Sequence, residues 1–347
     1  MALGVDDDLP MTGSAAGESL RRFSADELVA CVACARPNGP TRMNCLYCGA
    51  PLPAEGRVAA LRRPVLRKLE EWERGFNVVL VPAGAGRVSA EAAAEAESLL
   101  RLEPGRLSEC VESGRPLPLA RAASPEEATL IRERLTMLGF EAETVPDEAL
   151  ATHDPPVRVR ALELTGDALV CPAGADQREV RWDDLALFVT GRVTRKRVEL
   201  EERRGVVKGK DRVVNAREVV ASDDSVLDIY TRVEAEGAGW RVAANNFDYS
   251  CLGARKGLLA RDNFRTLLGA LRDAAPSAAF DDAYGRVRHL LSAVWPLAER
   301  TESAGLKRQG LGRFNTEAAT VVSNEEQFTR YSRLCRHFAL RGSGDVV

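Results

Sequence analysis

Histidine is scarce in this chain: its 347 residues include only three. A metal centre or proton relay built from imidazole groups therefore has little material to draw on. No segment approaches the roughly 18 to 20 consecutive apolar residues needed to cross a bilayer, so we expect no membrane span. The N-terminal stretch carries Asp6, Asp7 and Asp8 where a secretory signal would carry positive charge. These absences favour a cytoplasmic protein.

A strong excess of charge of one sign is also missing, since 48 basic residues accompany 51 acidic ones, for a formal net charge of -3. This balance argues against a protein whose whole surface binds nucleic acid, and any such binding must be local. The length allows two or three domains. Residues 1–25 have few large side chains and many small or acidic ones, so we expect them to form a disordered tail.

Cysteine is the residue whose arrangement stands out. Four of the eight cysteines form two CxxC pairs separated by ten residues, Cys31 and Cys34 followed by Cys45 and Cys48. Each CxxC turn can direct two thiolates to one point, and two such turns supply the tetrahedral set of sulfur ligands that Zn²⁺ prefers. The segment 26–55 resembles a zinc ribbon of the rubredoxin-like kind. That resemblance implies one structural Zn²⁺ per chain.

Other interpretations of the four-cysteine cluster have less support. Two disulfides are disfavoured in a chain without an export signal, because the cytosol keeps thiols reduced. A thioredoxin-type site needs a CxxC at the end of a strand in a βαβ unit, which the sequence does not show here. Iron with the same four ligands is also possible, because spacing alone does not distinguish zinc from iron. The remaining cysteines are expected in the core; they are Cys110, Cys171, Cys251 and Cys335.

The segment after the cysteines predicts a small α/β module. A linker helix is expected over 61–75, where apolar residues recur at helical spacing. Residues 76–148 then predict elements in the order β-α-α-β-α-β, with a capping box beginning at Ser124. With its ending SPEEATLIRERLTMLGFEAETV, this module resembles the C-terminal domain of the bacterial ribosomal stalk protein and the Clp protease adaptor of the same fold. The functional residues of neither family occur here, so the resemblance implies a protein-docking module without their activities.

The middle of the chain, residues 157–275, changes to an alternating apolar and polar pattern. This period of two predicts successive strands, and antiparallel pairing is favoured because the gaps are too short for helical crossovers. An amphipathic helix follows, with Phe264, Leu267 and Leu271 on one face. A sheet closed by such a helix, together with the stretch VRWDDLALFVTGRV, resembles bacterial members of the pleckstrin-homology-like superfold. The resemblance implies an interaction module.

Two basic segments are candidate phosphate-binding sites. Residues 192–212 hold nine basic and four acidic residues, and the candidate contacts are Arg195, Lys196 and Arg197. One interpretation is contact with the phosphate of a lipid headgroup or a nucleic acid; the other is a solvated hairpin whose glutamates face its arginines. The stretch GLKRQGLGRF contributes Lys307 and Arg308. We expect it to be a flexible basic loop within a helical C-terminal region, 276–347.

These features predict a multidomain α+β protein that contains a zinc ribbon, a small α/β module, an antiparallel β domain closed by a helix, and C-terminal helices. No set of acid, base, nucleophile and open metal site occurs at a recognisable spacing, so we expect no enzymatic activity. The expected function is that of a cytoplasmic adaptor or scaffold that docks protein partners of unknown identity. The alternative is a nucleic-acid-associated regulator that binds through the zinc ribbon and residues 192–212.

Overall fold

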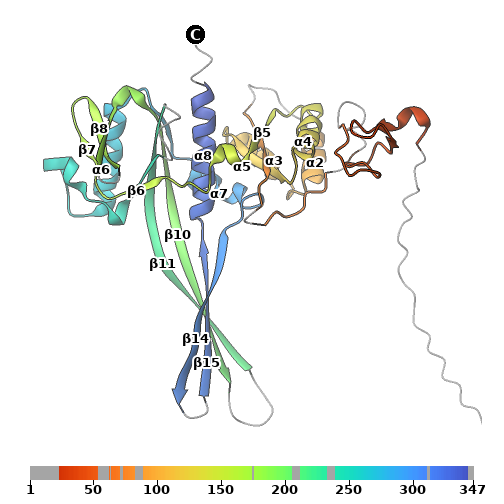
Figure 1. The fold of residues 1–347 in the computed structure, drawn as a ribbon. Coiled ribbons are helices and arrows are strands. Elements are labelled where there is room, and N and C mark those ends of the chain that lie inside the picture. Colours follow the sequence, from red (N-terminus) through yellow and green to blue (C-terminus); the bar gives the residue numbers. More distant parts are fainter. Residues whose placement is uncertain are drawn as a thin grey trace, which may run out of the picture. The chain divides into compact units, whose positions relative to one another are not determined.

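The chain folds as two compact units, Met1–Arg62 and Arg63–Val347. Together they contain helices and several sheets, in agreement with the predicted α+β class (Figure 1). The tail predicted over residues 1–25 lies, as far as residue 22, outside the part of the chain that can be described. This computed structural model describes residues 23–53, 62, 64–70, 73–82, 89–173, 176–204, 212–232, 239–310 and 313–342.

The first unit is small and has little regular structure. A 3-10 turn, η1 (Ala25–Glu27), precedes two short antiparallel strands, β1 (Val29–Ala30) and β2 (Pro37–Asn38). Its buried apolar cluster consists of Cys31, Cys45 and Leu52. The buried Arg62 side chain donates to the backbone carbonyls of Pro40, at 2.9 Å, and Leu52, at 3.0 Å. With so small a core, the unit needs a further source of stability.

The helix predicted over residues 61–75 is not formed in the described part of that range. Pro64 has no N–H to give to a helix, and Leu66 has a left-handed φ of 47°. The backbone N–H groups of Val65 and Leu66 donate instead to Oε1 of Glu127, at 2.7 and 2.8 Å. The Glu127 carboxylate, about 60 residues away in sequence, therefore accepts hydrogen bonds from N–H groups that would otherwise donate to carbonyls within a helix.

The segment after the linker has its elements in the predicted order. The strands are β3 (Phe76–Leu80), β4 (Leu117–Ala122) and β5 (Ala142–Pro146), and the helices are α2 (Ala90–Leu100), α3 (Arg106–Glu112) and α4 (Pro125–Met137). The strands form an antiparallel sheet in the order β4-β3-β5. The hydroxyl of Ser124 accepts from the N–H of Glu127 and begins α4 where the capping signal places it. A short helix, α5 (Asp147–Leu150), follows.

The largest sheet is built around two strands of 20 residues, β10 (Leu185–Arg204) and β11 (Arg212–Thr231). Its order is β14-β15-β10-β11-β12-β6. The pairing is antiparallel except where β6 (Val157–Val159) meets β12 (Trp240–Ala243) and where β13 (Ala279–Asp281) meets β10. Long connections separate those parallel partners, which makes the parallel arrangement feasible.

Beside this sheet lies a three-stranded sheet, β7 (Glu163–Leu164), β8 (Ala168–Ala173) and β9 (Asp176–Arg181), followed by the 3-10 turn η2 (Trp182–Asp184). Two more 3-10 segments, η4 (Ala244–Asn246) and η5 (Tyr249–Arg255), precede α6 (Ala260–Ala274). As predicted, α6 buries Phe264, Leu267 and Leu271, and this face joins an apolar core with residues of β8, β10 and β12.

The C-terminal region is not purely helical, which corrects the prediction for residues 276–347. It contains α7 (Tyr284–Leu291) and α8 (Glu325–Gly342), but between them a hairpin, β14 (Ala298–Gly310) and β15 (Arg313–Ser323). The predicted flexible loop GLKRQGLGRF belongs to this hairpin, with residues 311–312 outside the described part. The two strands lack an alternating apolar pattern. They are held in place by the pairing of β15 with β10, a tertiary contact that the local sequence does not predict.

The N-terminal end of α8 is fastened to β10 and β12. The buried Asn324 side chain accepts from the N–H of Thr194 at 2.7 Å and donates to the carbonyl of Arg192 at 2.9 Å. The buried Arg241 forms a bidentate ion pair with Asp228 at 2.6 and 2.8 Å and donates to the Thr329 hydroxyl at 3.1 Å. One apolar core then runs from the β3–β5 sheet to α7 and α8, so the segments separated in the prediction form one unit.

Close packing of α8 on β10 requires glycine at position 191. A Cβ there would lie 2.6 Å from a ring carbon of Phe328 and 3.0 Å from one of Tyr284. We expect Gly191→Ala to lower the free energy of unfolding by about 1 to 3 kcal/mol, the usual cost of overpacking a core. Urea denaturation followed by circular dichroism measures the change.

The matched control is Gly285→Ala in α7, where an added Cβ would meet no heavy atom within 4 Å. This variant is expected to be more stable than the parent by about 0.4 to 1 kcal/mol, because alanine restricts the unfolded chain. If Gly191→Ala were as stable as Gly285→Ala, α8 would not be pressed against β10 as described.

Candidate metal centre

The two CxxC pairs have the same backbone conformation. In the first, the N–H of Ala35 donates to the carbonyl of Cys31 at 2.8 Å; in the second, the N–H of Gly49 donates to the carbonyl of Cys45 at 3.0 Å. The residue that closes each turn has a left-handed φ, 56° at Ala35 and 74° at Gly49. Two equivalent turns thus direct their cysteine side chains to one place.

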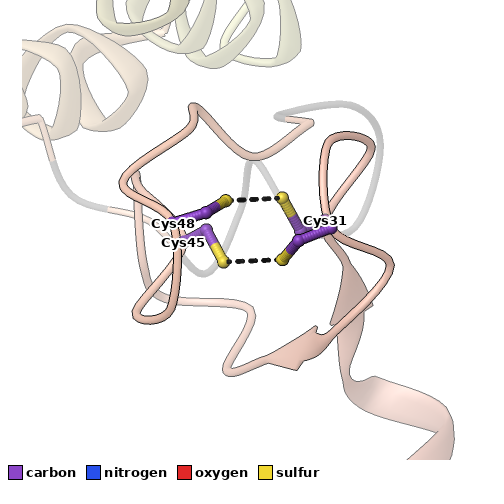
Figure 2. A group of neighbouring side chains, drawn as sticks. Cys31, Cys45 and Cys48 are labelled. Atoms are coloured by element: carbon purple, nitrogen blue, oxygen red, sulfur yellow. Dashed lines mark hydrogen bonds between the residues drawn. The ribbon is translucent and has the colours of Figure 1, made fainter.

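The structure brings all four predicted cysteines together. The sulfur atoms of Cys31, Cys34, Cys45 and Cys48 all lie within 4.8 Å of one another. The sulfur atoms of Cys31 and Cys48 are 3.6 Å apart, as a dashed line in Figure 2 marks, and those of Cys34 and Cys45 are also 3.6 Å apart. A tetrahedral ion with metal–sulfur bonds of roughly 2.3 Å separates its ligands by roughly 3.8 Å. The cluster therefore has the dimensions to hold one metal ion.

A buried asparagine supports the cluster from behind. The Nδ2 group of Asn38 donates to the sulfur of Cys45 at 3.4 Å and to the carbonyl of Arg36 at 2.9 Å, while its Oδ1 accepts from the N–H of Leu46 at 2.8 Å. Asn38 thus connects the strand after the first pair to the second turn. A single asparagine in the interval between the two pairs carries no sequence signal of this role.

The hydrogen bonds around the sulfur atoms favour thiolate at one position and thiol at another. Burial acts to raise the pKa of Cys45, but the N–H groups of Tyr47 and Cys48 and the Asn38 amide outweigh it and lower this pKa to about 6. At Cys48 the N–H of Ala50 lowers the pKa, but the other three thiols and burial raise it to about 12. Four thiolates this close repel one another, and a bound cation is what would let all four ionise.

The remaining cysteines lie apart from the cluster. Burial raises the pKa of Cys110 and of Cys171 to about 12, and it also raises the pKa of the half-buried Cys251 and Cys335. These four thiols are therefore protonated at neutral pH. Their surroundings are those of core side chains and not of activated nucleophiles.

The predicted phosphate contacts are not brought together. Arg195 and Lys196 are exposed and Arg197 is half-buried on β10, with Arg195 level with Ser323 of β15. The backbone of Lys307 is paired with residue 315 instead, eight residues further along β15, or roughly 26 Å. The side chains of Lys307 and Arg308 lie outside the described residues. One phosphate group therefore cannot contact both basic segments.

The second unit also contains a charged cavity of about 640 Å³ that no sequence motif predicts. Five arginines line it, among them Arg121, Arg195, Arg300 and Arg330 from four different elements, and five acidic residues line it as well. The buried Asp147 accepts from Arg121 at 2.5 Å and lies 3.8 Å from Arg330. Because opposite charges compensate each other, the cavity has no evident preference for anions or cations. Its residues are distant in sequence, so no local motif could reveal it.

Comparisons with known proteins do not identify the chain: no protein-family model, curated protein or solved structure matches it. Within the described residues, no helix is long and apolar enough to cross a membrane.

Removal of the Asn38 side chain tests whether this asparagine supports metal binding by the four cysteines. Asn38→Ala is expected to weaken metal binding by roughly 10- to 100-fold, the usual effect of losing a hydrogen-bond partner of a ligand. Competition with a chromophoric chelator measures the affinity. Asn44→Ala is the matched control, because Asn44 is exposed although it adjoins Cys45. Equal affinities in the two variants would contradict a supporting role for Asn38.

Proposed function

We propose that this chain is a non-enzymatic cytoplasmic adaptor or scaffold, in which a zinc ribbon with one structural Zn²⁺ presents a docking surface to other proteins. The observation that carries the proposal is the arrangement of the two CxxC turns. Their cysteines point to a common centre, while the residues between the cysteines point outward. The same backbone thus builds both a metal site and an apolar surface.

The choice of zinc and of a structural role rests on the ligands. Four thiolates in a tetrahedral arrangement are a typical structural zinc site, and they leave no coordination position open to water or substrate. The first unit otherwise has a very small core, of Cys31, Cys45 and Leu52. In such units the free energy of metal binding supplies the stability that the apolar core lacks.

The docking surface consists of Val32, Leu46 and Tyr47, which we call the knuckle surface. The exposed fractions are 81% for Val32, 63% for Leu46 and 52% for Tyr47. The Arg36 guanidinium lies 4.9 Å from the centre of the Tyr47 ring. Apolar groups exposed by a rigid backbone, with tyrosine and arginine among them, are typical of protein interfaces.

Two properties of the second unit also favour docking over catalysis. Burial keeps the thiols outside the cluster protonated, as at Cys110 and Cys171. In the charged cavity, the buried Asp147 carboxylate is held in ion pairs with Arg121 and Arg330. Buried, protonated thiols of this kind are not activated nucleophiles.

The proposal extends to the folds of the two larger segments. Residues 76–148 are assigned the ribosomal-stalk-like fold, which the β-α-α-β-α-β order and the antiparallel sheet β4-β3-β5 support. Residues 157–275 are assigned a pleckstrin-homology-like core, supported by strands β10 to β12 and the apolar face of α6. That core is extended by β15 and β14, which such a domain does not require. Both assignments make these segments interaction modules.

The metal proposal predicts about one zinc per chain by elemental analysis of protein purified without chelator. Removal of the metal is expected to unfold the first unit alone, because the second has its own apolar cores. Hydrogen exchange followed by mass spectrometry should then lose protection in residues 23–53 while β10 and β11 keep theirs. Iron in place of zinc, or less than half an equivalent of metal, would contradict the proposal.

The docking proposal is tested in two steps with the full chain. Proteins that co-purify from the native cell are identified, and the partner is then purified and titrated against the chain. Tyr47→Ala is expected to weaken this binding by at least tenfold, the usual loss at an interface hot spot.

Val111→Ser is the control for that experiment, because Val111 is also exposed but lies on α3 of the second unit. Both variants should retain their zinc. A further variant changes Val32, Leu46 and Tyr47 together to serine. If the partner binds both this variant and Tyr47→Ala as tightly as the parent, the knuckle surface is excluded as the docking site.

A further inference from the structure

A tip of two exposed leucines projects from the second unit at the start of α6. The Leu258 side chain is 102% exposed and the Leu259 side chain 59% exposed, in a protein whose other large apolar side chains are mostly buried. These residues follow η5 and directly precede the first residue of α6, Ala260. Nothing else in the described part of the second unit covers Leu258.

The tip has a defined conformation. The Oδ1 atom of the buried Asn263 accepts from the N–H of Gly257 at 2.6 Å, and its Nδ2 group donates to the carbonyl of Gly257 at 3.0 Å. The N–H of Lys256 donates to the carbonyl of Gly253 at 3.1 Å, and that of Asn263 to the carbonyl of Leu259 at 3.0 Å. Four hydrogen bonds therefore hold both leucines outward, whereas a less constrained loop would let them fold onto the protein.

Positive charge surrounds this apolar tip. Residues 255–265 contain four basic residues and one acidic residue. Arg261 and Arg265 are exposed one turn apart on the same face of α6. They share the carboxylate of Asp262, at 3.8 and 3.5 Å, and the Lys256 ammonium lies 3.2 Å from Asp248. The two carboxylates do not neutralise the four cations, so the tip keeps a net positive charge.

From this juxtaposition we propose that the tip formed by Leu258 and Leu259, with Arg255, Lys256, Arg261 and Arg265 around it, is a site of reversible association with an anionic lipid surface. The leucines enter the boundary between headgroups and acyl chains, and the cations contact lipid phosphates. A convex apolar apex suits a fluid bilayer, which closes around it, whereas a protein partner would need a matching groove. Two weak signals, apolar insertion and charge, act together here.

The experiment is co-sedimentation of the full chain with lipid vesicles. We expect binding to phosphatidylcholine vesicles that contain phosphatidylglycerol, little binding to phosphatidylcholine alone, and weakening by added salt. Leu258→Ser is expected to reduce the bound fraction, and Leu258→Ser with Leu259→Ser to reduce affinity at least tenfold. Leu258 makes so little contact with the protein that its replacement should not affect folding, which unchanged thermal unfolding checks.

Two further variants complete the test. Arg261→Gln with Arg265→Gln should weaken binding to anionic vesicles and flatten its salt dependence, because fewer counterions are exchanged. Met137→Ser, which removes another exposed apolar side chain, on α4, should bind like the parent.

Absence of binding to anionic vesicles at low salt would overturn the proposal, as would equal binding by the double leucine variant. A protein that binds the parent but not that variant, without vesicle binding, would assign the tip to protein docking instead. Variants of the knuckle surface should bind vesicles normally, so this proposal and the adaptor proposal can fail separately.

Discussion

The second unit depends on strand β10 being paired along both edges. On one edge it pairs with β11 along its length (Figure 1); on the other it pairs first with β13 and then with β15. Between those two partners the side chain of Asn324 bonds the backbone at Arg192 and Thr194 in place of a strand. The start of α8 is thereby set directly against β10, and the glycine at position 191 allows its side chains to approach. Four later segments of the chain, β11, β13, β15 and the start of α8, are thus joined at this strand.

The two units obtain their stability in different ways. In the second, large apolar cores pack helices against the sheets, and a buried Arg241–Asp228 ion pair joins β12 to β11 while Arg241 also donates to Thr329 of α8. Such a pair contributes little on balance but is costly to break, so it specifies the pairing of β11 with β12 more than it stabilises the fold. Through its bond to Thr329, the Arg241 that it orients also fixes the start of α8. In the first unit the core is minimal, and the four sulfur atoms occupy its centre. The two proposed surfaces reflect this difference. The knuckle surface is built on the two CxxC turns, whereas the leucine tip is built on a loop held by Asn263.

Local signals were read correctly where the interactions are local. The Ser124 cap and the apolar face of α6 both concern residues within a few positions of each other, and they form as predicted. The predicted linker helix failed because Glu127, some 60 residues away, captures the N–H groups of Val65 and Leu66. The β14–β15 hairpin was missed for the same kind of reason. Its strands lack an alternating pattern, and the partner that holds them is more than 100 residues distant in sequence.

The sequence by itself determined the four-cysteine cluster, because both CxxC turns and the interval between them lie within one short stretch whose geometry follows from its spacing. It also determined the α+β class and most helices, which depend on short-range periodicity and capping. Only the tertiary structure decided which basic residues lie near one another, which charges line the cavity, and which leucines remain outside. Those properties depend on the register of β10, β14 and β15 and on the packing of α8, and neither is a function of neighbouring residues alone.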